Sequence, residues 1–131
     1  MSLPSFSEDD LRKASKREDL IRETAAQIIK DFAEFDLSIG FSGNVHDFYQ
    51  ELFGQMKQHV AYLLSEKTEK FLNLLYRIDV DISDIESYQM QVPDVPFDSL
   101  VTELIIHREL RKVLMRDFFR RTGNDSSLKN A

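Results

Sequence analysis

The feature that most constrains the fold is residues 97–121, the longest uninterrupted helical pattern of hydrophobic residues in the chain. At about 100° of turn per residue, one arc of this segment is apolar. Its members are Leu100, Leu104, Leu110, Leu114, Met115 and Phe118. A long amphipathic helix of this kind is stable when other elements cover its apolar arc. The rest of the chain therefore has to supply covering elements.

The remaining segments have helical signals of their own. The sequence predicts helices over residues 16–35, 45–64, 69–78 and 83–90. The third is apolar nearly all round, so we expect it to be buried on several sides. Capping boxes are expected at Ser15 with Glu18 and at Ser83 with Glu86, and an N-cap at Asn44. The last helix is expected to have Asp98 as its N-cap and to end at Gly123. The two prolines near residues 92–96 predict a linker before it.

The predicted fold class is all-α, a bundle-like single domain of four to five helices over residues 15–123. Leu37, Ile39 and Phe41 alternate with polar or small residues, which predicts a short extended connector near residues 37–41 that places three apolar side chains under the bundle. Residues 1–14 are expected to form a flexible N-terminal arm and residues 124–131 a disordered tail.

Composition excludes several classes of site. The chain of 131 residues has no cysteine, so disulfides, thiolate metal sites and cysteine nucleophiles are absent. The net charge of -6 argues against broad binding of nucleic acid. The sequence has no run of 18 apolar residues and no signal-peptide pattern, so we expect a soluble cytoplasmic protein without a membrane segment.

Within the last helix, Glu103, His107 and Arg111 follow one another at a spacing of four residues, and we call these three the polar ladder. Their places on the helical wheel predict that they face inward. One interpretation is a partly buried network that fixes the register of the helices. The alternative is a metal or small-ligand site at which His59, expected on an inward arc of residues 45–64, joins His107 and Glu103.

The same helix carries Arg108, Lys112, Arg116 and Arg120, also four residues apart, and we call these four the basic ridge. The ridge is expected to point outward. The usual explanation is a solvated face that complements the negative end of the helix, with Glu109 and Asp117 interleaved. A weaker alternative is contact with nucleic acid or an acidic partner.

Metal and catalytic motifs are absent. The segment Asp79-x-Asp81-x-Ser83 begins like a calcium loop, but Asp84 and Met90 stand where that loop needs glycine and glutamate. None of the three histidines has the Glu-x-x-His spacing of diiron bundles. The sequence has no hydrolase, kinase or P-loop motif. We therefore predict a protein that is not an enzyme and has no cofactor and no resident metal.

The chain resembles small uncharacterised helical proteins of bacteria in two stretches. They are residues 71–80, FLNLLYRIDV, and residues 39–44, IGFSGN. The resemblance covers about residues 25–120, and it implies a bacterial cytoplasmic protein without carrying over any activity. Our leading expectation is a non-enzymatic helical interaction module that pairs with a second copy or with another protein.

Overall fold

The structure, a computed structural model, describes residues 9, 12–13 and 16–130, and it describes the side chains as far as Thr122. Five α-helices pack together in this part of the chain, and it contains no strand. They are α2 (Glu18–Ala33), α3 (Phe48–Glu66), α4 (Thr68–Ile78), α5 (Ile82–Gln91) and α6 (Phe97–Asn130), with the 3-10 turn η1 (Val45–Asp47) before α3. The predicted all-α single domain is confirmed.

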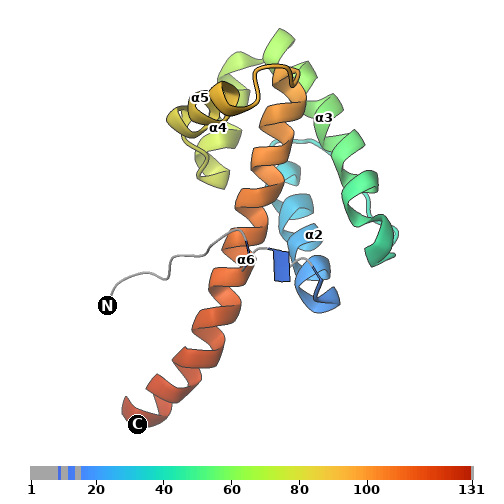
Figure 1. Cartoon of the computed structure of the whole chain (residues 1–131). Helices are drawn as coiled ribbons and strands as arrows, with labels where there is room; N and C mark the ends of the chain where they lie inside the picture. The colour runs from blue at the N-terminus through green and yellow to red at the C-terminus, as the bar shows by residue number, and fades with distance from the viewer. Residues whose placement is uncertain (1–8, 10–11, 14–15, 131) are drawn as a thin grey trace.

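The long helix α6 is the axis of the fold. It runs through the whole molecule in Figure 1, with α2 and α3 beside it and α4 and α5 across its first half. One line of four-residue steps along α6 is buried throughout, and it consists of Val101, Ile105, Glu109, Val113 and Asp117. Three of these five are aliphatic, so burial of their side chains drives the packing.

The main core lies where α2, α3, α4 and the first half of α6 meet. Phe32, Met56, Leu63, Leu74 and Leu100 are among its fully buried members. A smaller apolar cluster joins Leu20 of α2 to Val113 of α6, with Leu110 and Leu114 packed against it. The interface between α2 and α6 therefore has two apolar parts, and Glu109 lies between them along α6.

Two helix ends use aspartate where glycine is usual. Asp36 after α2 has φ 61 and Asp79 after α4 has φ 70, so both are left-handed. In each case the next residue donates its N–H back to a carbonyl five residues earlier, from Leu37 to Phe32 and from Val80 to Leu75. This is the Schellman arrangement, which satisfies carbonyls left open at the end of a helix. Aspartate tolerates this conformation better than most residues.

The connector after α2 matches its prediction. Residues 37–41 are not helical, Leu37 and Ile39 are buried, and Phe41 packs half-buried against Phe48. The side chain of Gln55 holds this connector in place through two hydrogen bonds to the backbone of Gly40. Oε1 of Gln55 accepts from the N–H of Gly40 at 2.9 Å, and Nε2 of Gln55 donates to the carbonyl of Gly40 at 2.8 Å. Asn44 caps η1 as predicted, since its Oδ1 accepts from the N–H of His46 at 3.1 Å.

Several expected boundaries differ from the structure. The cap of α2 is Arg17, because the helix begins two residues later than expected, and Ser15 lies outside the described residues. The capping box of α5 is formed by Asp81 and Asp84 rather than by Ser83 and Glu86. Both pairs have the three-residue spacing of a capping box. Val80 is buried directly before Asp81, and this anchors the chain at the point where α5 begins.

The end of α6 differs too. The helix begins at Phe97, before Asp98, and continues through Gly123 to Asn130. One glycine inside a helix costs only about 1 kcal/mol, so Gly123 does not have to end it. Most of the predicted N-terminal arm, residues 1–14, lies outside the described part of the chain.

The third predicted helix, α4, is not buried on several sides. Phe71, Leu74, Leu75 and Ile78 form its buried face. Its other face exposes 45% of Leu72 and 89% of Tyr76. The prediction was wrong because it counted apolar residues all round the helix, whereas α2, α3 and α6, its main neighbours in the described part of the chain, cover one face of α4.

Candidate functional site

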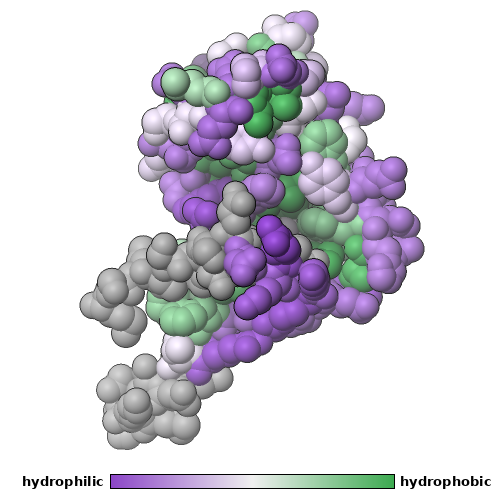
Figure 2. Space-filling view, in the orientation of Figure 1, coloured by the Kyte–Doolittle hydropathy of each residue, from purple (hydrophilic) through white to green (hydrophobic). Residues whose placement is uncertain are grey.

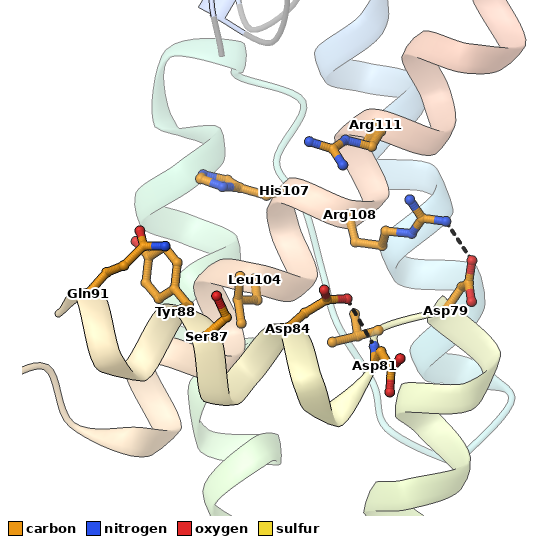
Figure 3. Close-up of a pocket in the computed structure, with 11 residues that line it drawn as sticks. Asp79, Asp81, Asp84, Ser87, Tyr88, Gln91, Leu104, His107, Arg108 and Arg111 are labelled. Carbon is orange, nitrogen blue, oxygen red and sulfur yellow. Dashed lines mark hydrogen bonds and ion pairs between the residues drawn. The ribbon is translucent and has the colours of Figure 1, made fainter. Parts of the chain in front are cut away.

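A pocket of about 540 Å³ opens between α5 and α6. Residues at helical spacing on α5 form one wall, the α5 wall, which consists of Asp84, Ser87, Tyr88 and Gln91. Residues at the same spacing on α6 form the facing α6 wall, which consists of Leu104, His107, Arg108 and Arg111. The turn between α4 and α5 closes one end of the pocket with residues 79–81. Figure 3 shows the labelled side chains of the α5 wall on the side of that helix that faces α6, and Arg108 turned aside to Asp79.

The α6 wall contains two groups that have no hydrogen-bond or ion-pair partner among the residues the structure describes. They are the guanidinium of Arg111 and the imidazole of His107, both exposed. Arg108 is different, because its Nη2 pairs with the carboxylate of Asp79 at the end of α4. Its Nε is buried without an acceptor. The charge that the pocket offers to a ligand on this wall is therefore mainly that of Arg111.

The α5 wall is acidic and polar. The side chain of Asp84 accepts a long bond of 3.4 Å from the backbone N–H of Asp81, and its other carboxylate oxygen faces the pocket region (Figure 3). Ser87 and Gln91 follow one and two turns later. A cationic wall thus faces an acidic wall across a space of the size that holds small ligands in other proteins.

The polar ladder does not face the core. Glu103 is half-buried, and His107 and Arg111 are exposed. The inward prediction was wrong because the arc drawn through Leu110, Leu114 and Phe118 is not the buried line of α6. Phe118 is 39% exposed, whereas the buried line passes through Glu109.

Glu103 and His59 do not join His107 in a metal site. His59 is half-buried on α3, and its Nε2 lies 2.7 Å from the carbonyl oxygen of Ser38, in the connector after α2. The charge of Glu103 acts on Tyr49 of α3, where it contributes, after burial, to a raised pKa of Tyr49. Within the described residues, no three His, Asp or Glu side chains are grouped closely enough to hold a metal ion. Only His107 of the predicted set lines the pocket.

The basic ridge is only in part the solvated face that was expected. Arg116 and Arg120 are exposed, as predicted, whereas Arg108 and Lys112 are half-buried, and all four lie beside acids of α2 or of the end of α4. Arg108 pairs with Asp79, Lys112 with Asp31 at 3.5 Å, and Arg120 with Glu23 at 3.1 Å. Arg116 lies 4.0 Å from Glu23 as well. The whole ridge is therefore engaged within the molecule, because its spacing of four places it beside the buried line of α6.

Sequence reasoning missed a buried pair of carboxyl groups, Asp31 of α2 and Glu109 of α6. Their side chains are 1% and 0% exposed. Gln27 donates to Asp31 at 2.9 Å, and Arg77 of α4 and Lys112 of α6 lie 3.6 Å and 3.5 Å from it. The pair joins three helices at one point. The signal that could have found Glu109 is the four-residue line that starts at Val101.

The two carboxyl groups differ in protonation. Burial, the hydrogen bond to Asp31 and the charge of Asp31 raise the pKa of Glu109 to about 8, although Lys112 opposes the shift. Burial also acts to raise the pKa of Asp31, but hydrogen bonds from Glu109 and Gln27 and the charges of Lys112 and Arg77 outweigh it and lower that pKa. Glu109 is therefore the protonated member at neutral pH.

The geometry agrees with a proton on Glu109. As a carboxylate, neither of its oxygens has a hydrogen-bond donor in the described residues. Lys112 Nζ lies 3.1 Å from Oε1 of Glu109, but this ion-pair contact lacks the alignment of a hydrogen bond. A proton on Glu109 supplies the missing donor toward Asp31, which avoids the cost of burying a second unpaired charge.

Comparisons of this chain with protein families, with curated proteins and with solved structures found no match. The resemblance expected for residues 39–44 and 71–80 therefore stays a prediction. No helix in the described part of the chain is both apolar enough and long enough to cross a lipid bilayer. The function has to be argued from the site itself.

Proposed function

We propose that this chain is a non-enzymatic binding protein that holds a small polar molecule in the pocket between α5 and α6. The observation that carries the proposal is the pair of unpartnered donors, Arg111 and His107, on one wall of a pocket of about 540 Å³. Because Arg111 has no acceptor among the described side chains, its guanidinium can bind one from a ligand. Of the three residues expected at the ligand site, His107 lines this pocket, whereas the α5 wall stands in the place expected for Glu103 and His59.

The pocket is held by elements that are well anchored. Ile85 is the buried residue of α5, and Val80 before that helix is buried too. On the other side, Ile105 and Ile106 fix α6 in the core next to Leu104 and His107. Both walls therefore keep their separation without a ligand, which reduces the entropy cost of binding.

Filling the pocket tests this function. We expect Ser87→Phe to abolish the thermal stabilisation that a bound small molecule gives, because the new ring occupies the space between the walls. A ligand at ten times its dissociation constant should stabilise the unaltered protein by about 1.4 kcal/mol. The measurement is a thermal-shift screen of small charged metabolites.

The control is Ser83→Phe, which adds the same ring at an exposed position of α5 outside the pocket lining. It should leave the stabilisation unchanged. A ligand that still stabilises Ser87→Phe does not bind in the pocket, and a screen in which no compound shifts the melting temperature contradicts the proposed function.

A second candidate is the interaction module, acting as a homodimer through the outer face of α4. The observation in its favour is that Tyr76 is 89% exposed and Leu72, one turn earlier, is 45% exposed. A two-fold axis brings this pair against the same pair of a second copy, which is the usual symmetry of small oligomers. Figure 2 shows that the apolar patches on the side of the molecule in view are separated by polar side chains.

We expect this dimer to be weak, because one short helix buries less than the roughly 800 Å² per partner of a standard interface. Light scattering over a range of concentrations should show a rising mass that Tyr76→Ser abolishes. Met90→Ser removes a side chain that is 84% exposed on α5 and serves as the control. A constant monomer mass at every concentration rules out the homodimer.

A further inference from the structure

We infer that the pocket takes a small zwitterion, with an anionic group on Arg111 and His107 and an ammonium group on Asp84. This inference rests on the proposed function and names the chemical class of its ligand. It goes beyond that function because it assigns the two walls to the two ends of one molecule.

The anionic end follows from the α6 wall. Arg111 presents a planar fork of donors that matches a carboxylate or a phosphate. His107 lies one turn before it on the same face and offers a ring N–H. Neither group is committed to another residue among those the structure describes. An anion placed between them would be bound by both.

The cationic end follows from the α5 wall. Asp84 accepts only the long bond from the N–H of Asp81, so most of its acceptor capacity remains. It lies across the pocket from Arg111 but forms no ion pair with it in the described structure. A ligand with one positive group could satisfy Asp84 while its negative group satisfies Arg111.

The other groups of the pocket fit this division. Arg108 and Asp79 neutralise each other, so they do not select for either charge. Leu104 and Tyr88 are half-buried between the charged groups and offer an apolar surface to an aliphatic chain (Figure 3). Ligands with two like charges leave either Asp84 or Arg111 facing an equal charge, which costs affinity.

The test is calorimetric titration of the whole chain with three probes of similar length. They are δ-aminovalerate, which is a zwitterion, glutarate, which has two negative groups, and cadaverine, which has two positive groups. We expect δ-aminovalerate to bind about tenfold more tightly than either of the others, which is the difference that one charge-assisted hydrogen bond makes. Phosphoethanolamine then distinguishes a phosphate from a carboxylate at the anionic end.

Two variants separate the ends of the ligand. Arg111→Gln should weaken δ-aminovalerate and glutarate about tenfold. Asp84→Asn should weaken δ-aminovalerate but leave glutarate as tight or tighter. The controls are Arg116→Gln on α6 and Glu86→Gln on α5, because neither residue lines the pocket. Circular dichroism of each variant confirms that the helices are intact.

Three outcomes overturn the inference. Glutarate binding more tightly than δ-aminovalerate, or no effect of Asp84→Asn, shows a simple anion site. Failure of all the probes shows that the ligand is not a zwitterion of this size. In each case a ligand from the metabolite screen that Ser87→Phe excludes leaves the proposed function standing, so the two failures are distinguishable.

Discussion

Replacing Glu109 with glutamine should raise the free energy of unfolding by about 3–5 kcal/mol near pH 9 and change it little near pH 5. The side chain is 0% exposed, and its pKa rises from 4.5 to about 8 on folding. A glutamine of the same shape is never charged and can still donate a hydrogen bond to Asp31. It therefore reproduces the protonated form of Glu109 at every pH.

The sign follows from proton binding. Between 4.5 and about 8, the unfolded chain releases the proton of Glu109 while the folded protein keeps it. Its contribution to stability is therefore fully present below 4.5, falls as pH rises toward 8, and is lost above that value. The variant removes this fall.

Urea denaturation at several pH values measures the effect. Glu103→Gln is a matched control, because it makes the same change at a half-buried position on the same helix. Equal stabilities of the Glu109→Gln variant and the unaltered protein across the pH range would contradict a protonated Glu109.

Removing the other carboxyl group should have the opposite effect. We expect Asp31→Ala to destabilise the protein by about 3–5 kcal/mol at neutral pH, because loss of one member of a buried charged group leaves the others without a partner. Lys112, Arg77 and Gln27 lose an acceptor, and the proton of Glu109 loses its own. The measurement is the midpoint of urea denaturation.

A double variant separates lost charge pairing from lost packing. Asp31→Leu with Lys112→Met replaces Asp31 and the more buried of its two cationic partners by apolar groups, and it should recover part of the stability, because Arg77, Gln27 and Glu109 still lack their acceptor. Asp94→Ala is a control at an exposed aspartate in the linker before α6. The interpretation of Asp31 as the charged centre of the cluster is wrong if Asp31→Ala is no more harmful than Asp94→Ala.

Local signals predicted the helices well, because they depend on residues close together in the chain. The connector with Leu37 and Ile39, the Asn44 cap and the proline linker all follow from near neighbours. The orientation of α6 about its own axis did not follow from near neighbours. The apolar residues Leu110 and Leu114 placed the predicted buried face away from Glu109. The residues that make a buried carboxyl group possible there include Asp31 and Arg77, which are distant in the sequence.

The candidate pocket was partly predictable for the same reason. The helical spacing of the polar ladder already grouped His107 with Arg111, although the residue expected to join His107 from another helix was His59. The α5 wall could not be assigned, because its role depends on how α5 lies across α6. That placement depends on how Val80 and Ile85 pack against the other helices. The local sequence pattern predicts that these residues are apolar and helical or flanking, but it does not identify the helix that they contact.

The packing of α2 against α6 joins the two ends of the chain (Figure 1), and this has a consequence for synthesis on the ribosome. Arg17 contacts Asp117 across 100 positions of sequence, and Lys112 contacts Asp31 across 81. Helix α2 therefore leaves the exit tunnel before α6, its main partner, is made. Its apolar face, with Leu20, Ile28 and Phe32, is exposed on the nascent chain until α6 has emerged.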